Sequence, residues 1–416
     1  MELKKSIKAT KKAYVEFLRS GSTEAKNRFL SDLAKRIKNS SSYLLEQNKL
    51  DMDAAEAKGV TAAFLDRLLL TKSRIEDVAA SCLQIGTLDD PVGRIEEMTT
   101  RPQGFRVGKM STPIGVIAII YEARPNVTVE AATLCIKSGN AVILKGGSDA
   151  HFSNGAFAKL ICQSLRAANL SSDLVNFIVS KDRAVIGEIV KMEGYVDCVI
   201  PRGGEGLIRA VAASATVPVL KHYKGVCHLY VDKECDLQMA KNIAVNAKVQ
   251  RPAVCNSLET LLIHKDIAED FLPAVAEKLK SCGVVLRGCD RSFAILNGTI
   301  EKVEKENFFN EYLDLILNVK VVDSIEEAIS HINYYGSAHT DAIVTKNIAA
   351  SNLFVKAVDS SSVIVNATTR LSDGGVYGLG AEIGISTDKL HARGPMGLEE
   401  LTSKKWIVFG EGHIRN

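Results

Sequence analysis

The spacing of hydrophobic positions changes near residue 114 of this chain. Before it, residues 1–85 carry apolar side chains at helical spacing in the stretches AYVEFLRS, RFLSDLAKRIKN, AAFLDRLLL and IEDVAASCLQIG. After it, short apolar runs such as GVIAIIY at 115–121 alternate with helical patterns. Strands that alternate with helices of this length predict parallel sheets covered by helices on both faces. We therefore expect an α/β fold of the type that binds nucleotides.

Two large domains are expected, because 416 residues exceed what one hydrophobic core usually supports. The first is predicted to combine the helices of residues 1–88 with the nucleotide-binding strands of residues 114–230 and part of residues 366–388. The second is predicted over residues 231–365 and carries Cys255.

Residues 89–113 interrupt both patterns. The stretch DDPVGRIEEMTTRPQGFRVGKMSTP is rich in turn residues and alternates polar with apolar positions, which favours a two-stranded arm over core strands. The tail, residues 389–416, contains the strand-like sequence KKWIVFG. We expect these segments to form an oligomerisation arm, in which the arm and the strand at 404–409 pair between subunits and cover exposed edges.

Composition narrows the class of protein. Hydrophobic residues make up 46% and charged residues 24% of the chain, as in soluble globular proteins. The net charge of +3 is too small to indicate a nucleic-acid partner, and no arginine-rich stripe with aromatic residues is present. The longest apolar run falls far short of the roughly 20 residues that span a membrane, and the N-terminus lacks the apolar stretch of a secretory signal.

The nine cysteines show no CxxC pair and no Cys/His spacing of a zinc site, so no metal is expected. An odd number of scattered thiols is typical of a reducing, cytoplasmic environment. Most lie in predicted helices or strands, where a buried thiol acts as a small apolar side chain. Cys255 differs, because in QRPAVCNSLET it lies in a loop, where the thiol is either a nucleophile or a structural group.

Two glycine-bearing loops follow predicted strands at the edge where α/β proteins bind ligands. Backbone N–H groups at the start of the next helix attract phosphate, but a simple turn of the chain explains the glycines equally well. Neither loop carries a GxGxxG fingerprint. The candidate cofactor-binding residues are Lys145, Gly146, Gly147 and Ser148 in VILKGGSDA, and Gly203 and Gly204 in VIPRGGEGLIRAV.

Histidines lie in two further motifs, His222 and His228 in HYKGVCH, and His331 and His339 in HINYYGSAHTD. An isolated histidine is more often a hydrogen-bonded structural group than a catalytic base. We expect the structural role for each of them.

Seven motifs carry a resemblance to a known family. They are YEARPNVTVEAA, LKGGSDA, IPRGGEGLI, HYKGVCHLYVD, QRPAVCNSLETLLIH, AISHINYYGSAHTDAI and LHARGPMGLEELTSKKWIVFGEG. Together they closely resemble the gamma-glutamyl phosphate reductase family of the aldehyde dehydrogenase superfamily, over essentially the whole chain. The resemblance implies an aldehyde-dehydrogenase-like fold with two Rossmann-like α/β domains, parallel sheets and a small oligomerisation arm. It also implies the reduction of L-glutamyl 5-phosphate by NADPH to L-glutamate 5-semialdehyde and phosphate, the second step of proline biosynthesis.

Individual residues acquire roles from the same resemblance. The family motif places the nucleophile, which forms a thioester, at Cys255, and Asn126 in RPN matches the asparagine that helps to bind the oxyanion. Lys145 matches the lysine that contacts the adenosine ribose or its 2′-phosphate. Glu311 falls where the superfamily has a glutamate for the nicotinamide ribose, although Tyr312 begins a different continuation.

Substrate binding requires cations for the phosphate and for the α-carboxylate. Arg124 and Arg202 lie in suitable loops, and either one could equally pair with a carboxylate of the fold. Asn256, next to the nucleophile, is a third candidate for substrate binding. Beyond the substrate, we expect a homodimer or larger homo-oligomer and a functional contact with glutamate 5-kinase.

Two other functions compete with this interpretation. An oxidative NAD(P)-dependent aldehyde dehydrogenase acting on a small aldehyde would need a carboxylate that activates water near Cys255. In hydrolytic members of the superfamily that glutamate lies in an ELGGK-like stretch, and the matching stretch here, HYKGVCH, has no acid. A nucleotide-binding or scaffold protein without chemistry would have no need of the complete nucleophile loop.

Overall fold

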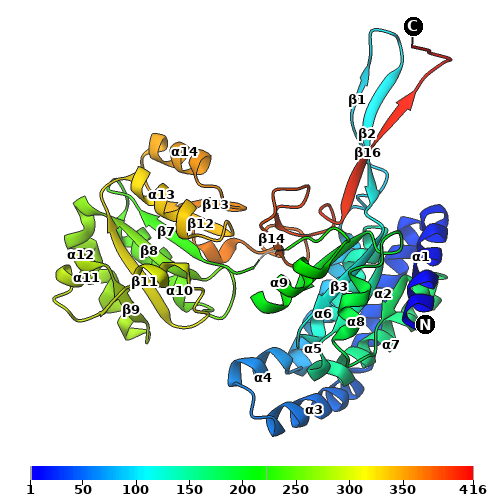
Figure 1. Ribbon diagram of the computed structural model, residues 1–416, viewed down its shortest axis with the longest axis horizontal. Coiled ribbons are helices and arrows are strands. Elements are labelled where there is room, and N and C mark those ends of the chain that lie inside the picture. The colour runs from blue at the N-terminus through cyan, green and yellow to red at the C-terminus, as the bar shows by residue number, and fades with distance from the viewer. Residues whose placement is uncertain (1, 222, 416) are drawn as a thin grey trace. The chain divides into compact units, whose positions relative to one another are not determined.

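The computed structural model describes residues 2–221 and 223–415, so His222 lies outside the described residues. The chain divides into two compact units, which are labelled by element in Figure 1. Unit 1 comprises residues 1–221, 378–384 and 389–416, and unit 2 comprises residues 222–377 and 385–388.

Amphipathic helices open unit 1, as the spacing over residues 1–85 predicts. In α2 the Ser22 hydroxyl accepts the Ala25 N–H and begins the helix. One face of α2 then buries Phe29 and Leu33. The opening helices are α1 (Glu2–Ser20), α2 (Thr23–Asn39), α3 (Ser41–Ala57), α4 (Ala62–Leu68) and α5 (Lys72–Thr87).

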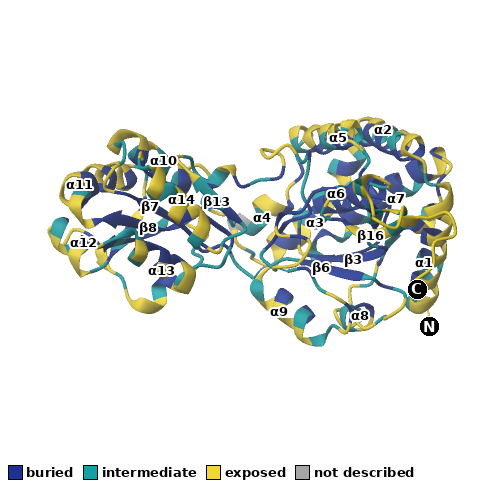
Figure 2. Ribbon diagram, turned by 90° about the horizontal axis from the view of Figure 1, so that it is seen from above, coloured by how far each residue is buried: buried dark blue, intermediate teal, exposed yellow. Residues whose placement is uncertain are grey.

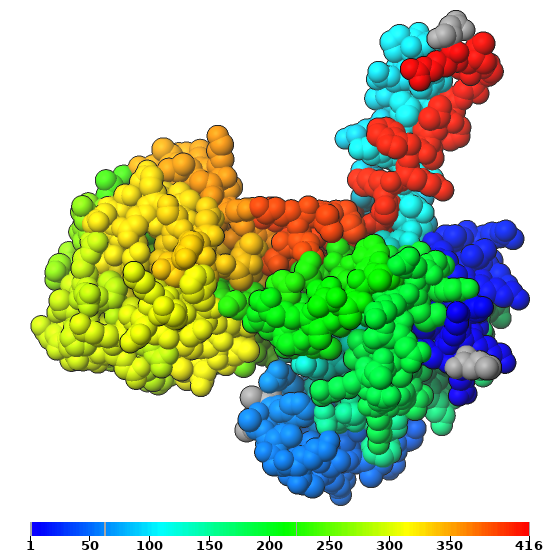
Figure 3. Space-filling model, viewed as in Figure 1, coloured from blue at the N-terminus to red at the C-terminus, as the bar shows by residue number. Residues whose placement is uncertain are grey.

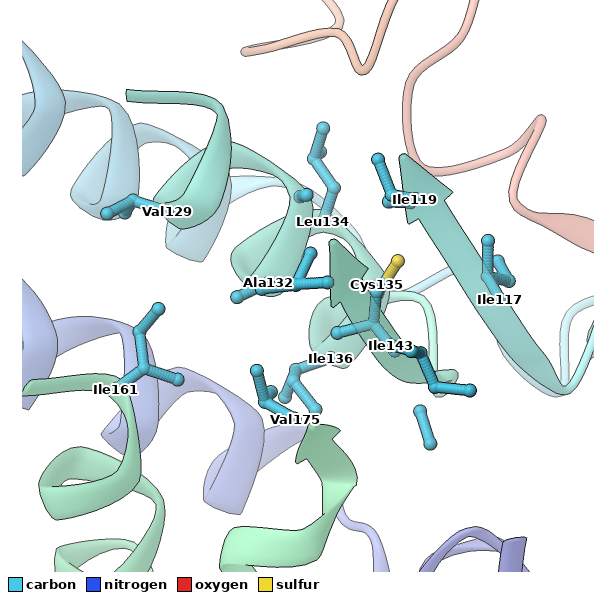
Figure 4. Close-up of a cluster of buried hydrophobic side chains, with 14 of the residues drawn as sticks. Ile117, Ile119, Val129, Ala132, Leu134, Cys135, Ile136, Ile143, Ile161 and Val175 are labelled. Atoms are coloured by element: carbon cyan, nitrogen blue, oxygen red, sulfur yellow. The ribbon is translucent and has the colours of Figure 1, made fainter. Parts of the chain in front are cut away.

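The sheet of unit 1 has the strand order β5-β4-β3-β6, and its strands are parallel. The strands β3 and β4 are buried along their whole length, which explains their continuous apolar sequence. Figure 4 shows Ile117 and Ile119 of β3 beside Cys135 of α6, so Cys135 is a core thiol. The elements are β3 (Val116–Tyr121), α6 (Pro125–Lys137), β4 (Ala141–Gly146), η1 (Ser148–Ala150), α7 (His151–Ala167), η2 (Ser172–Leu174), β5 (Val175–Phe177), α8 (Ala184–Ile189), β6 (Cys198–Arg202) and α9 (Glu205–Ser214).

Unit 2 is built on a second parallel sheet, of order β10-β9-β11-β8-β7-β12-β13. In β8, Leu261 and Ile263 pack with α10 and α11, whereas Leu262 packs with α13 and α14 on the opposite face. Figure 2 shows buried strands between helices whose outer faces are exposed. The elements are β7 (Cys227–Val231), α10 (Leu237–Val249), β8 (Leu258–His264), α11 (Lys265–Ser281), β9 (Val285–Gly288), α12 (Asp290–Ile295), β10 (Glu301–Lys302), η3 (Lys305–Phe309), β11 (Ile316–Val322), α13 (Ile325–Tyr335), β12 (Thr340–Val344), α14 (Ile348–Ala357), β13 (Ser362–Val365), η4 (Thr369–Leu371) and β14 (Ile385–Ser386).

The predicted α/β fold with parallel sheets is confirmed, but the boundary between the units differs from the expectation. Strand β7 pairs with β8 and β12 in unit 2, so the first domain, expected over 114–230, ends before it. Of residues 366–388, only 378–384 belong to unit 1. A buried parallel strand has the same apolar pattern in either sheet, so the sequence could not assign β7.

The arm forms an antiparallel sheet of order β1-β2-β16 within unit 1. Within one chain β16 pairs with β2, from Thr402 opposite Pro113 to Phe409 opposite Arg106. The expected pairing of the arm and the tail between subunits stays a prediction. Figure 1 shows the three strands as one extended ribbon, and Figure 3 shows the same segments, in cyan and red, with their atoms filled in. The strand β16 is an edge of this sheet. The bounds are β1 (Ile95–Thr100), β2 (Arg106–Pro113), β15 (Gly394–Pro395) and β16 (Thr402–Phe409).

Helices able to cross a membrane are absent from residues 2–221 and 223–415, where none is both long and apolar enough.

Candidate active site

Cys255 lies in the loop that joins α10 to β8 in unit 2. The loop stands at the amino end of β8, a strand in the middle of its sheet. Ligands of open parallel sheets usually bind at the carboxyl ends of the strands, so this position is not one that the fold rule predicts. The Cys255 side chain is partly exposed, whereas Cys135 and Cys227 are buried. A thiol in a loop that solvent can reach meets the first requirement of a nucleophile.

Gly225 and Cys227 hold the main chain of this loop. An added Cβ at Gly225 would lie 1.8 Å from the Cys255 carbonyl oxygen, so only glycine fits there. From β7, the Cys227 thiol donates to the same carbonyl oxygen, with an S···O distance of 3.2 Å. Burial raises the pKa of Cys227 well above its ordinary value, so this group remains a protonated donor.

Glu311 reaches the same point of the structure. Its Oε1 accepts the Gly225 N–H at 2.9 Å, and the next N–H, of Val226, donates to the Ser337 hydroxyl at 2.8 Å. Glu311 and Cys255 therefore both lie against Gly225. The expected contact of Glu311 with the nicotinamide ribose stays a prediction.

Asn256 is buried directly after the nucleophile. Its Nδ2 donates to the Ser372 carbonyl oxygen at 2.9 Å. We expected this residue to bind the substrate, and that role stays a prediction.

A buried ion pair connects the two elements that flank the Cys255 loop. Lys248 of α10 lies 2.9 Å from the carboxylate of Glu259 in β8, and both side chains are fully buried. Burial raises the pKa of Glu259 to about 7, although Lys248 opposes the shift. Glu259 also accepts the Leu313 N–H at 3.3 Å.

The described histidines of the motifs are buried, and each forms a polar contact through Nδ1, while their structural role stays a prediction. His228 Nδ1 lies 2.9 Å from Asp341 Oδ1, and His339 Nδ1 lies 2.9 Å from the Thr340 hydroxyl. Burial lowers the pKa of His331 to about 2, and the nearby His228 contributes less to the same shift. His331 is therefore neutral near pH 7.

Unit 1 gathers the predicted cofactor-binding loops at the carboxyl end of its sheet. Strands β4 and β6 flank β3, and Tyr121 at the end of β3 is in register with both Gly146 and Arg202. The order of strands reverses beside β3, where open α/β sheets bind ligands. The topology thus places the loop at 145–148 and the loop at 203–204 at one edge.

Lys145 is a buried cation in the first of these loops. Its side chain is 4% exposed, and Nζ donates to the Gly146 carbonyl oxygen at 2.9 Å. Burial, and then the positive charge of Arg183, lower its pKa. A buried ammonium that bonds to a carbonyl oxygen favours the approach of an anion.

Contacts with Glu122 offer an explanation other than phosphate binding for the glycines of the loop at 203–204. The Glu122 carboxylate accepts the Gly204 N–H at 3.0 Å and so occupies one donor at the start of α9. An added Cβ at Gly203 would lie 2.6 Å from the Glu122 Cδ, so a larger residue there would displace the Glu122 side chain. The loop at 145–148 is therefore the better candidate for a phosphate group.

The remaining predicted residues also lie in unit 1. Arg124 precedes the first turn of α6, and the Asn126 Nδ2 donates to Glu130 Oε1 at 2.9 Å on that helix. The Arg202 guanidinium packs against Gly384, where an added Cβ would lie 3.0 Å from Nη1. The roles expected for Arg124, Asn126 and Arg202 stay predictions.

Gly225, Cys227 and Arg370 lie at the nucleophile loop although no sequence pattern predicted them there. Gly225 and Cys227 lie in HYKGVCH, where a glycine just before a buried strand was the available signal. Arg370 lies in the glycine-rich tail, and its position beside the loop depends on strand order rather than on any local pattern.

Comparison with known proteins places this architecture in a family. A model described as "Aldehyde dehydrogenase family" matches residues 1–295. The chain belongs to the aldehyde dehydrogenase family. Among curated proteins, a gamma-glutamyl phosphate reductase of Thermodesulfovibrio yellowstonii is 51% identical over 96% of this chain and 95% of the relative. A protein of the same name from Persephonella marina is 50% identical over 96% of this chain and 92% of the relative.

Solved structures agree with this placement. The crystal structure of gamma-glutamyl phosphate reductase from Thermotoga maritima matches with a TM-score of 0.97 at 42% identity, covering 100% of both chains. An acetylating aldehyde dehydrogenase from Geobacillus thermoglucosidasius matches with a TM-score of 0.70 at 17% identity, covering 100% of this chain and 98% of that one, which shows the fold alone. The predicted family is confirmed, and an oxidative dehydrogenase is not favoured.

Proposed function

We propose that this protein reduces L-glutamyl 5-phosphate to L-glutamate 5-semialdehyde and phosphate with NADPH, as the second step of proline biosynthesis. The observation that supports this proposal is the Cys255 loop, a reachable thiol whose main chain is held by Gly225 and Cys227. It occurs in a chain that is 51% identical to a relative named for this activity.

The loop after β4 fits a phosphorylated dinucleotide. Lys145 places a buried positive charge there, and an added Cβ at Gly147 would lie 3.4 Å from the Ala123 nitrogen, so the backbone passes close to the end of β3. We propose that Lys145, Gly146, Gly147 and Ser148 hold the ribose phosphate, with Gly203 and Gly204 in support, and that Glu311 holds the nicotinamide ribose. The bound NADPH would supply the hydride.

Cys255 carries the covalent chemistry in this proposal. Its sulfur forms a bond to the acyl carbon while the bond from that carbon to the phosphate oxygen breaks, and phosphate leaves with the electron pair. Asn126 stabilises the oxyanion, for which the loss of one donor costs about 3 kcal/mol. Hydride addition to the thioester and departure of the sulfur then release the semialdehyde.

The proposal also covers the residues that bind the substrate, the partners of the protein and its compartment. Arg124 and Arg202 bind anionic groups of the substrate, and the protein acts as a homo-oligomer in the cytoplasm. None of the nine cysteines in the described residues forms a disulfide, which suits a reducing compartment. A functional contact with glutamate 5-kinase would supply the acyl phosphate.

The test follows NADP⁺ reduction with glutamate 5-semialdehyde in the presence and absence of phosphate. We expect wild-type activity to require phosphate, and Cys255→Ser to lower kcat/KM by at least about a thousandfold, because the nucleophile is lost. Cys282→Ser, a partly exposed thiol at the end of α11, is the matched control and should keep full activity. Oxidation without phosphate would support the oxidative dehydrogenase instead, and full turnover by Cys255→Ser would reject the nucleophile.

A further inference from the structure

The turn that follows β13 packs against the nucleophile loop, and η4 within it contacts α10, β7 and β12. Arg370 Nε donates to Gln250 Oε1 at 2.9 Å, and the Asn256 Nδ2 donates to the Ser372 carbonyl oxygen at 2.9 Å. Gln250 and Asn256 stand before and after Cys255 in one loop. The first bond holds the Arg370 guanidinium at the nucleophile loop, and the second ties the main chain of the same turn, at Ser372, to that loop.

The hydrogen bond of Arg370 in the described part of the chain goes to the Gln250 amide oxygen, which is neutral. Asp373, the acid of this turn, uses its Oδ1 to accept the N–H groups of Gly375 and Val376. Burial, and then the positive charge of Arg251, lower the pKa of Arg370. Asp373 opposes this shift, but the Arg370 guanidinium is held by Gln250 rather than by a carboxylate. A guanidinium fixed in this way keeps donors that can bind an anion.

We infer that Arg370, together with Arg251, binds an anionic oxygen group of the substrate beside Cys255. The planar guanidinium donates two parallel hydrogen bonds to carboxylate or phosphate oxygens. L-Glutamyl 5-phosphate offers both groups, the phosphate on the carbon that the sulfur attacks and the α-carboxylate at the other end. The inference rests on the proposed function and adds a site in unit 2 to Arg124 and Arg202 of unit 1.

The reverse reaction separates the two anions, because phosphate and glutamate 5-semialdehyde are then different substrates. Arg370→Met keeps a long side chain and removes its charge. We expect the KM for one of the two substrates to rise about 10- to 100-fold, with a smaller change in kcat, because a charged hydrogen-bond donor is lost. A rise for phosphate assigns the site to the phosphate group, and a rise for the semialdehyde assigns it to the α-carboxylate.

Two further variants complete the experiment. Arg291→Met removes a guanidinium that pairs with Asp323 at 2.8 Å on the surface of the same unit, and it should change neither KM. Arg370→Lys keeps the positive charge but lacks the two parallel N–H donors of the guanidinium, so it should raise the same KM by a smaller factor. This variant keeps the test valid even if Arg370→Met folds poorly.

Wild-type KM values for both substrates in Arg370→Met and Arg370→Lys, or a fall in kcat alone, would overturn the inference while leaving the proposed function intact. A wild-type protein without phosphate-dependent activity would reject the proposed function, and this inference with it.

Discussion

At the scale of single residues, the site depends on backbone contacts as much as on the reactive thiol. The Cys255 carbonyl oxygen accepts a hydrogen bond from the Cys227 thiol and lies against Gly225. The Gly225 N–H in turn donates to the Glu311 carboxylate. These contacts fix the direction of the loop and hence the position of the sulfur. A nucleophile positioned this way is sensitive to small changes in residues that carry no chemistry.

Gly225→Ala tests this sensitivity. An added methyl group 1.8 Å from the Cys255 carbonyl oxygen must displace the main chain of the loop. We expect kcat/KM to fall at least about 100-fold, since a displacement of the order of 1 Å has that effect on a reacting group. Gly187→Ala in α8, where an added Cβ meets nothing within 4 Å, is the control and should keep full activity. Normal turnover by Gly225→Ala would show that the loop tolerates the shift.

At the scale of elements, α2 is joined to the segment that leads into the arm by one buried ion pair. Lys26 Nζ lies 2.8 Å from Asp90 Oδ2, and both side chains are at least nine-tenths buried. Thr23 donates to the same carboxylate oxygen at 2.7 Å. Burial by itself would raise the pKa of Asp90, but the hydrogen bonds from Lys26 and Thr23 prevail and lower it.

Asp90→Asn should lower the free energy of unfolding by about 3–5 kcal/mol at pH 7, because the Lys26 charge is left buried without its partner. The Asp90 carboxyl binds its proton less tightly in the folded chain, so its contribution is complete above the unfolded pKa of roughly 4 and is lost as the pH falls through the lower folded pKa. Urea unfolding from pH 7 to pH 3 should show the difference between wild type and variant shrinking below about pH 4. Glu24→Gln, which breaks an exposed pair with Arg28 in the same helix, should cost less than about 1 kcal/mol. If the difference in unfolding free energy between wild type and Asp90→Asn did not change with pH, the lowered pKa of Asp90 would be contradicted.

At the scale of the whole molecule, the arm presents an apolar edge. The strand β16 pairs on one side with β2 and carries Trp406, which is 67% exposed, together with the exposed Val408 and Phe409. An edge strand with exposed apolar side chains is a place where a second chain can pair. We therefore keep the arm as the proposed oligomerisation element.

Removal of the residues from Lys404 onward should reduce the mass measured by light scattering, because most of β16 is lost. A chain that ends after Phe409 keeps β16 and is the matched control. Circular dichroism would establish that both chains retain their helices. An unchanged mass for the shorter chain would remove the arm from the interface.

The sequence by itself determined the α/β class, the family and the candidate nucleophile. Periodicity reports which side chains are buried, and motifs such as QRPAVCN are contiguous, so neither depends on knowing which strands are neighbours. The location of Lys145 and its loop could also be predicted from the sequence, because a loop that follows a buried strand lies at the carboxyl edge of an open sheet.

Only the tertiary structure decided what surrounds Cys255. Gly225 meets its carbonyl because β7 and β8 are adjacent, and Arg370 reaches its loop because η4 packs on α10 and β7. The same adjacency assigned β7 to unit 2, and it placed β16 beside β2 within one chain. Strand order is set by packing among distant segments, and a buried parallel strand carries no local mark of its neighbours.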